Sequence, residues 1–135
     1  MAERYEVAVG AGTLYIDEGF ALAHRWTGAG VTVDAPFTGA HFLHVAVAGS
    51  VLDDVYREAN ARGVALDGVR VTARGGFDPE TWASSGIEYT VAVDSTASPA
   101  DIEDLLGAVD EVAEIPRALR TASSVRRVGQ GDPDE

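Results

Sequence analysis

Hydrophobic and polar residues follow a strand-like alternation over most of the first third of the chain. From Glu3 to Ile16, "RYEVAVG" and "TLYID" alternate with period two on either side of "AGT", which predicts an amino-terminal hairpin. The Gly-rich stretch "GFALAHRWTGAG" is typical of a short strand or a loop. The next segment, "GVTVDAP", predicts a short strand that ends at Pro36.

The pattern becomes helical from about Ala40 to Arg62. The first half of this predicted helix is apolar nearly all round, and its second half opens a polar face. Gly63 then provides a residue suited to a left-handed cap. A helix that is apolar on every side must be covered by its own sheet or by a partner subunit.

A second pair of strands follows this helix. The segments "GVRVTARGG" and "GIEYTVAVD" alternate with period two and predict a hairpin with the long connection "GFDPETWASS". The positions expected to face the core are Val69, Val71, Ile87, Tyr89, Val91 and Val93.

A second long helix is predicted after Ser98, an N-cap residue that Pro99 and Asp101 support in the first turn. We expect it to end near Ile115, because Pro116 disfavours helical geometry in the residue before it. "SSVRRVG" predicts a last short strand, and "QGDPDE" predicts a disordered acidic tail. The pattern therefore indicates a single α+β domain over residues 1–128, followed by a tail over residues 129–135.

Charge narrows the classes of function. Ten basic and 22 acidic residues give a net charge of −12, which opposes binding to nucleic acid or to an anionic membrane surface. The longest apolar run, Phe42 to Leu52, is shorter than the roughly 20 residues of a membrane span, and "MAERYEV" has no signal-like apolar region. We therefore expect a cytoplasmic protein whose partner is a small apolar molecule or another protein.

Ser50 is a lone hydroxyl within the apolar stretch "VAVAGSVLDDV". A serine nucleophile needs a neighbouring base, but the positions one turn away on a helix are Val47, Ala46, Asp53 and Asp54. The stretch also lacks a G-x-S-x-G elbow. We therefore favour a packed or pocket-lining hydroxyl over a nucleophile.

His41 and His44 share one face near the start of the central helix. Such a pair can hold a metal if a third ligand arrives, for which His24 and Asp34 are the candidates. The pair can also perform acid–base chemistry at a pocket mouth, or only satisfy local hydrogen bonds at the helix start. We favour the last interpretation, and we expect no metal and no cofactor.

The order of elements resembles the OsmC family, which includes the organic hydroperoxide resistance proteins. The resemblance covers about Val31 to Val128 and is most specific in "REANARGVALDGVRVTARG" and in "EIPRAL". It implies an OsmC-like fold in which two long helices pack with antiparallel sheets. It also implies an intertwined homodimer whose two central helices pack together, in agreement with the all-round apolar helix.

The resemblance further implies a thiol peroxidase site, which this chain lacks. Members typically use two cysteines, whose positions match Ser50 in "VAGSV" and Ile115 in "EIPRAL", and the chain contains no cysteine. The family carboxylate falls near Ala40 or His41, neither of which is acidic, and Arg25 is the nearest candidate for the family arginine. Peroxide reduction needs a thiolate that is oxidised and then condenses with a second thiol, which a serine hydroxyl cannot do.

These observations lead to one preferred hypothesis and two alternatives. We expect a cysteine-less OsmC-like homodimer that binds a small apolar ligand in an interface pocket and has no peroxidase activity. The pocket residues would be Ser50, Ile115, Glu114, Phe42 and Tyr56. The first alternative is a non-redox enzyme, such as an isomerase, cyclase or hydrolase, that uses His41, His44 or Arg25 as catalytic residues. The second is a structural dimer without a ligand.

Overall fold

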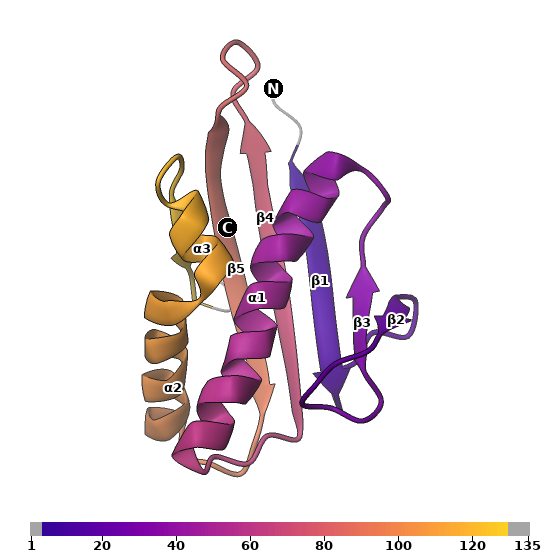
Figure 1. Cartoon of the computed structure of the whole chain (residues 1–135), viewed down its shortest axis with the longest axis vertical. Helices are drawn as coiled ribbons and strands as arrows, with labels where there is room; N and C mark the ends of the chain where they lie inside the picture. Colours follow the sequence, from indigo (N-terminus) through magenta and orange to yellow (C-terminus); the bar gives the residue numbers. More distant parts are fainter. Residues whose placement is uncertain (1–3, 130–135) are drawn as a thin grey trace.

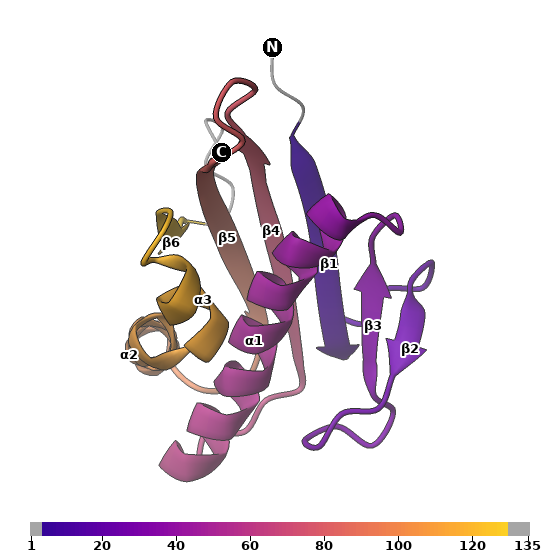
Figure 2. The same cartoon turned by 45° about the horizontal axis from the view of Figure 1, so that its top comes forward.

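The computed structural model describes residues 4–129, which form a six-stranded sheet with three helices on one of its faces (Figures 1 and 2). The predicted α+β class is confirmed. The strand order in the sheet is β2-β3-β1-β4-β5-β6, and every neighbouring pair is antiparallel except β5 and β6, which are parallel. The elements are β1 (Tyr5–Gly12), β2 (Phe20–Leu22), β3 (Val31–Asp34), α1 (Gly39–Arg62), β4 (Gly68–Phe77), β5 (Ser84–Asp94), α2 (Pro99–Val112), α3 (Glu114–Leu119) and β6 (Val125–Arg127).

The predicted amino-terminal hairpin is wrong. Strand β1 forms as expected, but residues 13–16 turn away from it, with hydrogen bonds from the Leu14 amide to the Ala11 carbonyl and from the Tyr15 amide to the Gly12 carbonyl. Both edges of β1 are instead occupied by later strands, β3 on one side and β4 on the other. The alternation in "TLYID" therefore arises from a turn that buries Ile16.

Helix α1 is capped at both ends by the residues that its sequence provides. The Thr38 hydroxyl accepts a hydrogen bond from the His41 amide, and Gly63 adopts the predicted left-handed conformation with φ 71°. The helix runs diagonally across β1 and β4 (Figure 1). Its buried apolar side chains pack there against the inward-facing valines of the sheet and form the core. The core thus lies between the sheet and one side of α1.

The predicted hairpin of β4 and β5 is confirmed, with Val71 opposite Val91 and Ala73 opposite Tyr89. Of the six positions expected to be buried, Val91 and Val93 are only half-buried and pack at the margin of the core. The other four, Val69, Val71, Ile87 and Tyr89, are fully buried.

Helix α2 begins as predicted but ends earlier. The Ser98 hydroxyl accepts a hydrogen bond from the Asp101 amide, while the helix stops at Val112 rather than near Ile115. A third helix, α3, begins at Glu114 and contains Pro116 in its first turn. An amide in the first turn of a helix has no partner within the helix, so a proline at that position costs no hydrogen bond. The proline is therefore compatible with the start of a new helix.

The chain returns to the sheet as β6, which confirms the predicted last strand, and pairs with β5. A polar cluster fixes this return: the Tyr89 hydroxyl donates a hydrogen bond to the Asp110 carboxylate, which also pairs with Arg120 at 3.1 Å. The Arg120 guanidinium donates a second hydrogen bond to the Val125 carbonyl at 2.8 Å. Residues 130–135 of the predicted tail lie outside the described residues.

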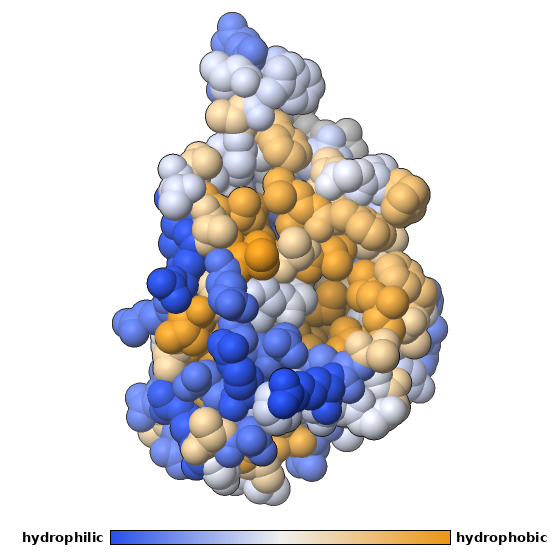
Figure 3. Space-filling model, viewed as in Figure 1, coloured by the Kyte–Doolittle hydropathy of each residue, from blue (hydrophilic) through white to orange (hydrophobic). Residues whose placement is uncertain are grey.

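The side of α1 that faces away from the sheet is only partly covered. Ala46 is exposed, and Val45, Gly49 and Ser50 are half-buried. Figure 3 shows hydrophobic surface over the amino-terminal part of α1 and the strands beside it, whereas the surface over α2 and the carboxyl end of α1 is hydrophilic. No helix within residues 4–129 is long and apolar enough to span a membrane.

Candidate functional site

Ser50 and Ile115 lie next to each other although 65 positions separate them in the sequence. The Ile115 amide donates a hydrogen bond to the Ser50 hydroxyl oxygen at 3.4 Å, near the upper limit for such a bond. Ser50 belongs to the middle of α1, and Ile115 belongs to the first turn of α3, with a side chain that is 39 % exposed. The packing of α3 on α1 therefore brings together the two positions for which the sequence resemblance implied cysteines.

A buried acid lies one turn of α1 beyond Ser50. Asp54 is 2 % exposed, and one of its carboxylate oxygens pairs with Arg57 at 2.7 Å. The other oxygen, Oδ2, has no hydrogen-bond partner among residues 4–129. Burial raises the pKa of Asp54, and the negative charges of Asp53, Glu114 and Glu58 add to this effect, while Arg57 opposes it.

We expect Asp54→Asn to stabilise the protein at neutral pH. Because the folded-state pKa is raised, Asp54 contributes stability when protonated, and this contribution is lost as the pH rises through the folded-state pKa. Burial of the ionised carboxylate therefore costs stability at neutral pH, and its removal should raise the free energy of unfolding.

Urea unfolding of the Asp54→Asn variant at pH 7 and at pH 4 measures this effect. The gain should shrink at the lower pH, because a larger fraction of the wild-type carboxyl is then protonated. Asp104→Asn, at an exposed position of α2, provides the control and should change little at either pH. A loss of stability in the Asp54 variant at pH 7 would mean that the Arg57 pair outweighs the burial cost.

His44 is enclosed in the core rather than open to a pocket. It is 1 % exposed, its Nδ1 lies 2.7 Å from the Ala40 carbonyl oxygen, and its ring packs against Tyr5 and Phe77. Burial lowers the pKa of His44, so its ring is neutral and donates the Nδ1 hydrogen to Ala40. Its Nε2 has no hydrogen-bond partner among the described residues.

The other two catalytic candidates also make local contacts. The Nδ1 of His41 lies 2.7 Å from the Thr38 hydroxyl, within the cap of α1. The Arg25 guanidinium lies over the ring of Trp26, 5.3 Å from its centroid. Within residues 4–129, no hydrogen bond or ring contact joins His41, His44 or Arg25 to Ser50, and no group of three metal-ligating side chains could hold a metal ion.

The remaining predicted pocket residues are divided among three places. Glu114 precedes Ile115 in α3 and is exposed beside the Ser50 contact. Phe42 packs edge-on against the exposed Phe37 at the start of α1. Tyr56 lines a separate cavity of about 160 Å³ with Trp26, Ala59, Asn60, Val64 and Leu66. The structure thus brings Ser50 together with Ile115 and Glu114, whereas Phe42 and Tyr56 have other surroundings.

The sequence interpretation did not predict a second group of polar side chains that lie together, His24, Thr27 and Asp53. The loop between β2 and β3 places His24 against α1, where its Nε2 lies 3.1 Å from the Asp53 carboxylate and its Nδ1 lies 2.9 Å from the Thr27 hydroxyl. The sequence interpretation assigned His24 only the role of a candidate third metal ligand beside His41 and His44. Its three-residue spacing from Thr27 gave a weak signal, but no periodicity links the loop to Asp53, 29 positions later.

Comparison with known proteins identifies the fold. No family model and no curated protein matches the sequence. An OsmC-like protein from Mycoplasma pneumoniae has a similar structure, with a TM-score of 0.62 at 11% identity, over 85% of this chain and 98% of that one.

Two further solved structures agree with this result. An organic hydroperoxide resistance protein OsmC from Legionella pneumophila, described as a predicted redox protein, has a TM-score of 0.58 at 17% identity, over 84% of this chain and 97% of that one. An OsmC-like protein of unknown function from Vibrio cholerae has a TM-score of 0.56 at 11% identity, over 96% of this chain and 99% of that one. The resemblance expected from the sequence is confirmed for the architecture: the chain has the OsmC-like fold and no cysteine.

Proposed function

We propose that the protein forms a homodimer through the uncovered side of α1 and binds a small apolar ligand at the interface, beside Ser50 and Ile115, without reducing hydroperoxides. The observation that carries this proposal is the contact between the Ile115 amide and the Ser50 hydroxyl. It pairs the two positions at which the resemblance implies the thiols of family peroxidases, in a chain that has no cysteine. This contact supports a pocket in which a hydroxyl and an aliphatic side chain stand where the resemblance implies two thiols.

The surroundings of this contact favour an apolar ligand. Ile115 exposes its side chain, and on the partly covered side of α1 Ala46 is exposed and Gly49 is half-buried. An uncovered apolar surface on a soluble protein commonly marks an interface. The small side chains at positions 46 and 49 would permit a second helix to approach closely.

Acid–base catalysis by the three candidates named above receives less support. His44 is enclosed and hydrogen-bonded to Ala40, and His41 is engaged by Thr38. A general base must be within hydrogen-bond reach of the proton that it removes. Neither histidine contacts the Ser50 and Ile115 pair, so we favour ligand binding over this chemistry.

We expect Gly49→Glu to convert a dimer into a monomer that remains folded. A Cβ atom at Gly49 would meet no other atom within 4 Å in the single chain, so the substitution is compatible with the fold, but it would place a charge on the proposed helix contact. Gly107→Glu in α2 is the matched control, because a Cβ there also has open space. Sedimentation should give a monomer for the first variant and a dimer for the second.

Native mass spectrometry of protein purified from its own cell tests the ligand. The proposal predicts a dimer mass with additional bound mass that is lost from Gly49→Glu and kept in Gly107→Glu. A monomeric wild-type protein contradicts the proposed assembly. A dimer without added mass supports a structural dimer instead, and reduction of cumene hydroperoxide by the wild-type protein contradicts the loss of peroxidase activity.

A further inference from the structure

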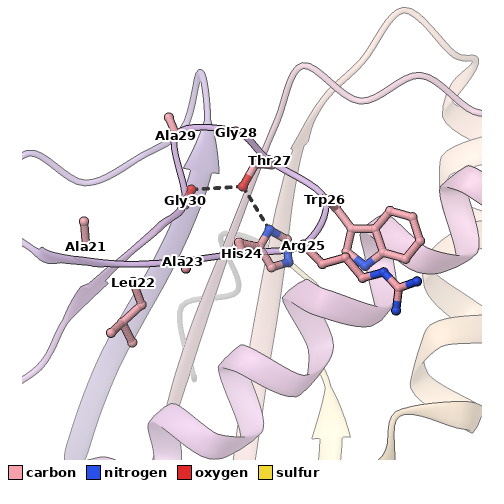
Figure 4. Close-up of a pocket in the computed structure, with 10 residues that line it drawn as sticks. All are labelled: Ala21, Leu22, Ala23, His24, Arg25, Trp26, Thr27, Gly28, Ala29 and Gly30. Carbon is pink, nitrogen blue, oxygen red and sulfur yellow. Dashed lines mark hydrogen bonds between the residues drawn. The ribbon is translucent and has the colours of Figure 1, made fainter.

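The segment that ends β2 and runs to β3 borders an open surface pocket of about 370 Å³, which residues 21–30 line (Figure 4). This volume lies within the usual range for small-molecule sites. His24 and Thr27 both line the pocket, and their hydrogen bond is drawn in Figure 4. The side chain of His24 is 9 % exposed, whereas that of Asp53, on α1, is 50 % exposed.

Asp53 determines which nitrogen of a neutral His24 carries the hydrogen. A carboxylate only accepts hydrogen bonds, so at 3.1 Å from Asp53 the Nε2 of His24 must be the protonated nitrogen. The Nδ1 then has a free lone pair and accepts from the Thr27 hydroxyl at 2.9 Å. This is the order of groups, hydroxyl to imidazole to carboxylate, that activates a hydroxyl nucleophile.

The Thr27 hydroxyl has a second acceptor within reach. The Gly30 carbonyl oxygen lies 3.0 Å from Oγ1, so the hydroxyl hydrogen can turn toward either Gly30 or His24. When it turns to Gly30, the Nδ1 of His24 must carry a hydrogen of its own, which requires the imidazolium. The neutral form of His24 therefore selects the arrangement in which Thr27 donates to the imidazole.

Two backbone amides follow Thr27 without a hydrogen-bond partner among the described residues. Gly30 donates its amide hydrogen to the Thr27 carbonyl, whereas the amides of Gly28 and Ala29 donate to no described group. The space beside Gly28 is open, since an added Cβ would meet no atom within 4 Å. Free amides next to a nucleophile are the donors that stabilise the oxyanion of an acyl-transfer transition state.

We propose that Thr27, His24 and Asp53 form a site that hydrolyses small uncharged esters. Thr27 Oγ1 bonds to the ester carbonyl carbon while its proton passes to His24 Nδ1. The bond to the leaving alkoxide then breaks, and His24 returns the proton to that oxygen. Water, deprotonated by the same nitrogen, attacks the Thr27 ester, which releases the carboxylic acid and restores the hydroxyl.

In this site Thr27 and His24 are the catalytic residues, and Asp53 is a positioning residue. The charge of the protein, −12, and the carboxylate of Asp53 favour neutral substrates over anionic ones. The pocket also presents Ala21, Leu22 and Ala29, which suit a short aliphatic acyl group. The site is independent of the Ser50 and Ile115 contact.

The test uses p-nitrophenyl acetate and the full chain, with peptide mapping of the acetyl group. Acetylation should occur at Thr27 and not at Thr38, which provides an internal control. The Thr38 hydroxyl also lies 2.7 Å from a histidine Nδ1, that of His41, but no carboxylate bonds the other nitrogen of that ring within residues 4–129. Thr27→Val should abolish acetylation, Thr27→Ser should retain it, and Thr121→Val, at an exposed position, should leave the rate unchanged.

Variants of His24 and Asp53 distinguish a role in catalysis from a role in folding. His24→Gln should lower the rate of acetylation by at least about 100-fold, the contribution of a general base. Asp53→Asn should lower it and change its pH profile, because an amide can also donate to Nε2 and so no longer fixes the tautomer of the ring, and Asp53→Glu should retain both. Circular dichroism checks that each variant is folded. Equal acetylation of Thr27 and Thr38, or a rate unaffected by Asp53→Asn in a folded protein, would overturn the proposal.

Discussion

Replacing Ser50 and Ile115 together with cysteine is expected to create a disulfide between α1 and α3 that raises the stability of the protein. The Ile115 amide lies 3.4 Å from the Ser50 hydroxyl oxygen, so bond lengths keep the two Cα atoms within about 7 Å, the upper end of the disulfide range. The closed loop spans 65 positions, for which the chain-entropy estimate is about 4 kcal/mol. The melting temperature of the oxidised protein should therefore exceed that of its reduced form and of the wild-type protein.

The same variant tests the comparison with family peroxidases. Its reduced form should consume tert-butyl hydroperoxide with a dithiol as donor and form the disulfide, because the first thiolate accepts the oxygen and the second condenses with it. Ser50→Cys and Ile115→Cys, made singly, are the controls and should form no internal disulfide. Failure of the double variant to form one would contradict the observed packing. A disulfide without peroxide consumption would count against a retained peroxidase-type pocket.

Gly75→Ala is expected to destabilise the fold by about 2–3 kcal/mol, as overpacking of a filled core does. A Cβ at this position in β4 would lie 2.6 Å from the Gly86 carbonyl oxygen and 2.6 Å from His44 Nε2. His44 cannot retreat freely, because its ring packs against both Tyr5 and Phe77 and its Nδ1 is bonded to Ala40. Urea unfolding of the variant and the wild-type protein measures the loss.

A second glycine substitution controls for the change in the unfolded chain. A Cβ at Gly107 in α2 would meet nothing within 4 Å. Gly107→Ala should therefore stabilise the protein by up to about 1 kcal/mol through helix propensity. Equal effects of the two substitutions would show that the space around Gly75 is not closed in solution.

Local sequence signals predicted the elements whose determinants are also local. The bounds of α1 followed from its apolar pattern and from Gly63, and the start of α2 followed from Ser98 and Pro99. The amino-terminal hairpin failed because "TLYID" alternates like a strand, while the partners of β1 come from β3 and β4. The partner of a strand is determined by the arrangement of the whole sheet. Periodicity within one segment predicts a strand but not the strand with which it pairs.

In the candidate site, too, local sequence signals did not predict the contacts between distant segments. The pairing of Ser50 with Ile115 was expected from the resemblance alone, because no local sequence pattern in either segment predicts a contact with the other. The burial of His44 was missed because spacing near a helix start does not reveal which way the sheet lies. The contact of His24 with Asp53 depends on how a Gly-rich loop folds over α1. The path of such a loop could not be predicted, because its sequence has no hydrophobic periodicity.

The central place of β1 in the sheet also governs the order in which the protein can fold during synthesis. This first strand is bordered by β3 and β4, and the last residue of β4, Phe77, is translated 65 positions after Gly12, the last residue of β1. At common elongation rates that interval is roughly 3–13 s. Until β4 is made, one edge of β1 has no partner strand, which makes the newly made amino-terminal third a natural substrate for chaperones. A ribosome stalled before β4 would accordingly display a chain that aggregates rather than a folded intermediate.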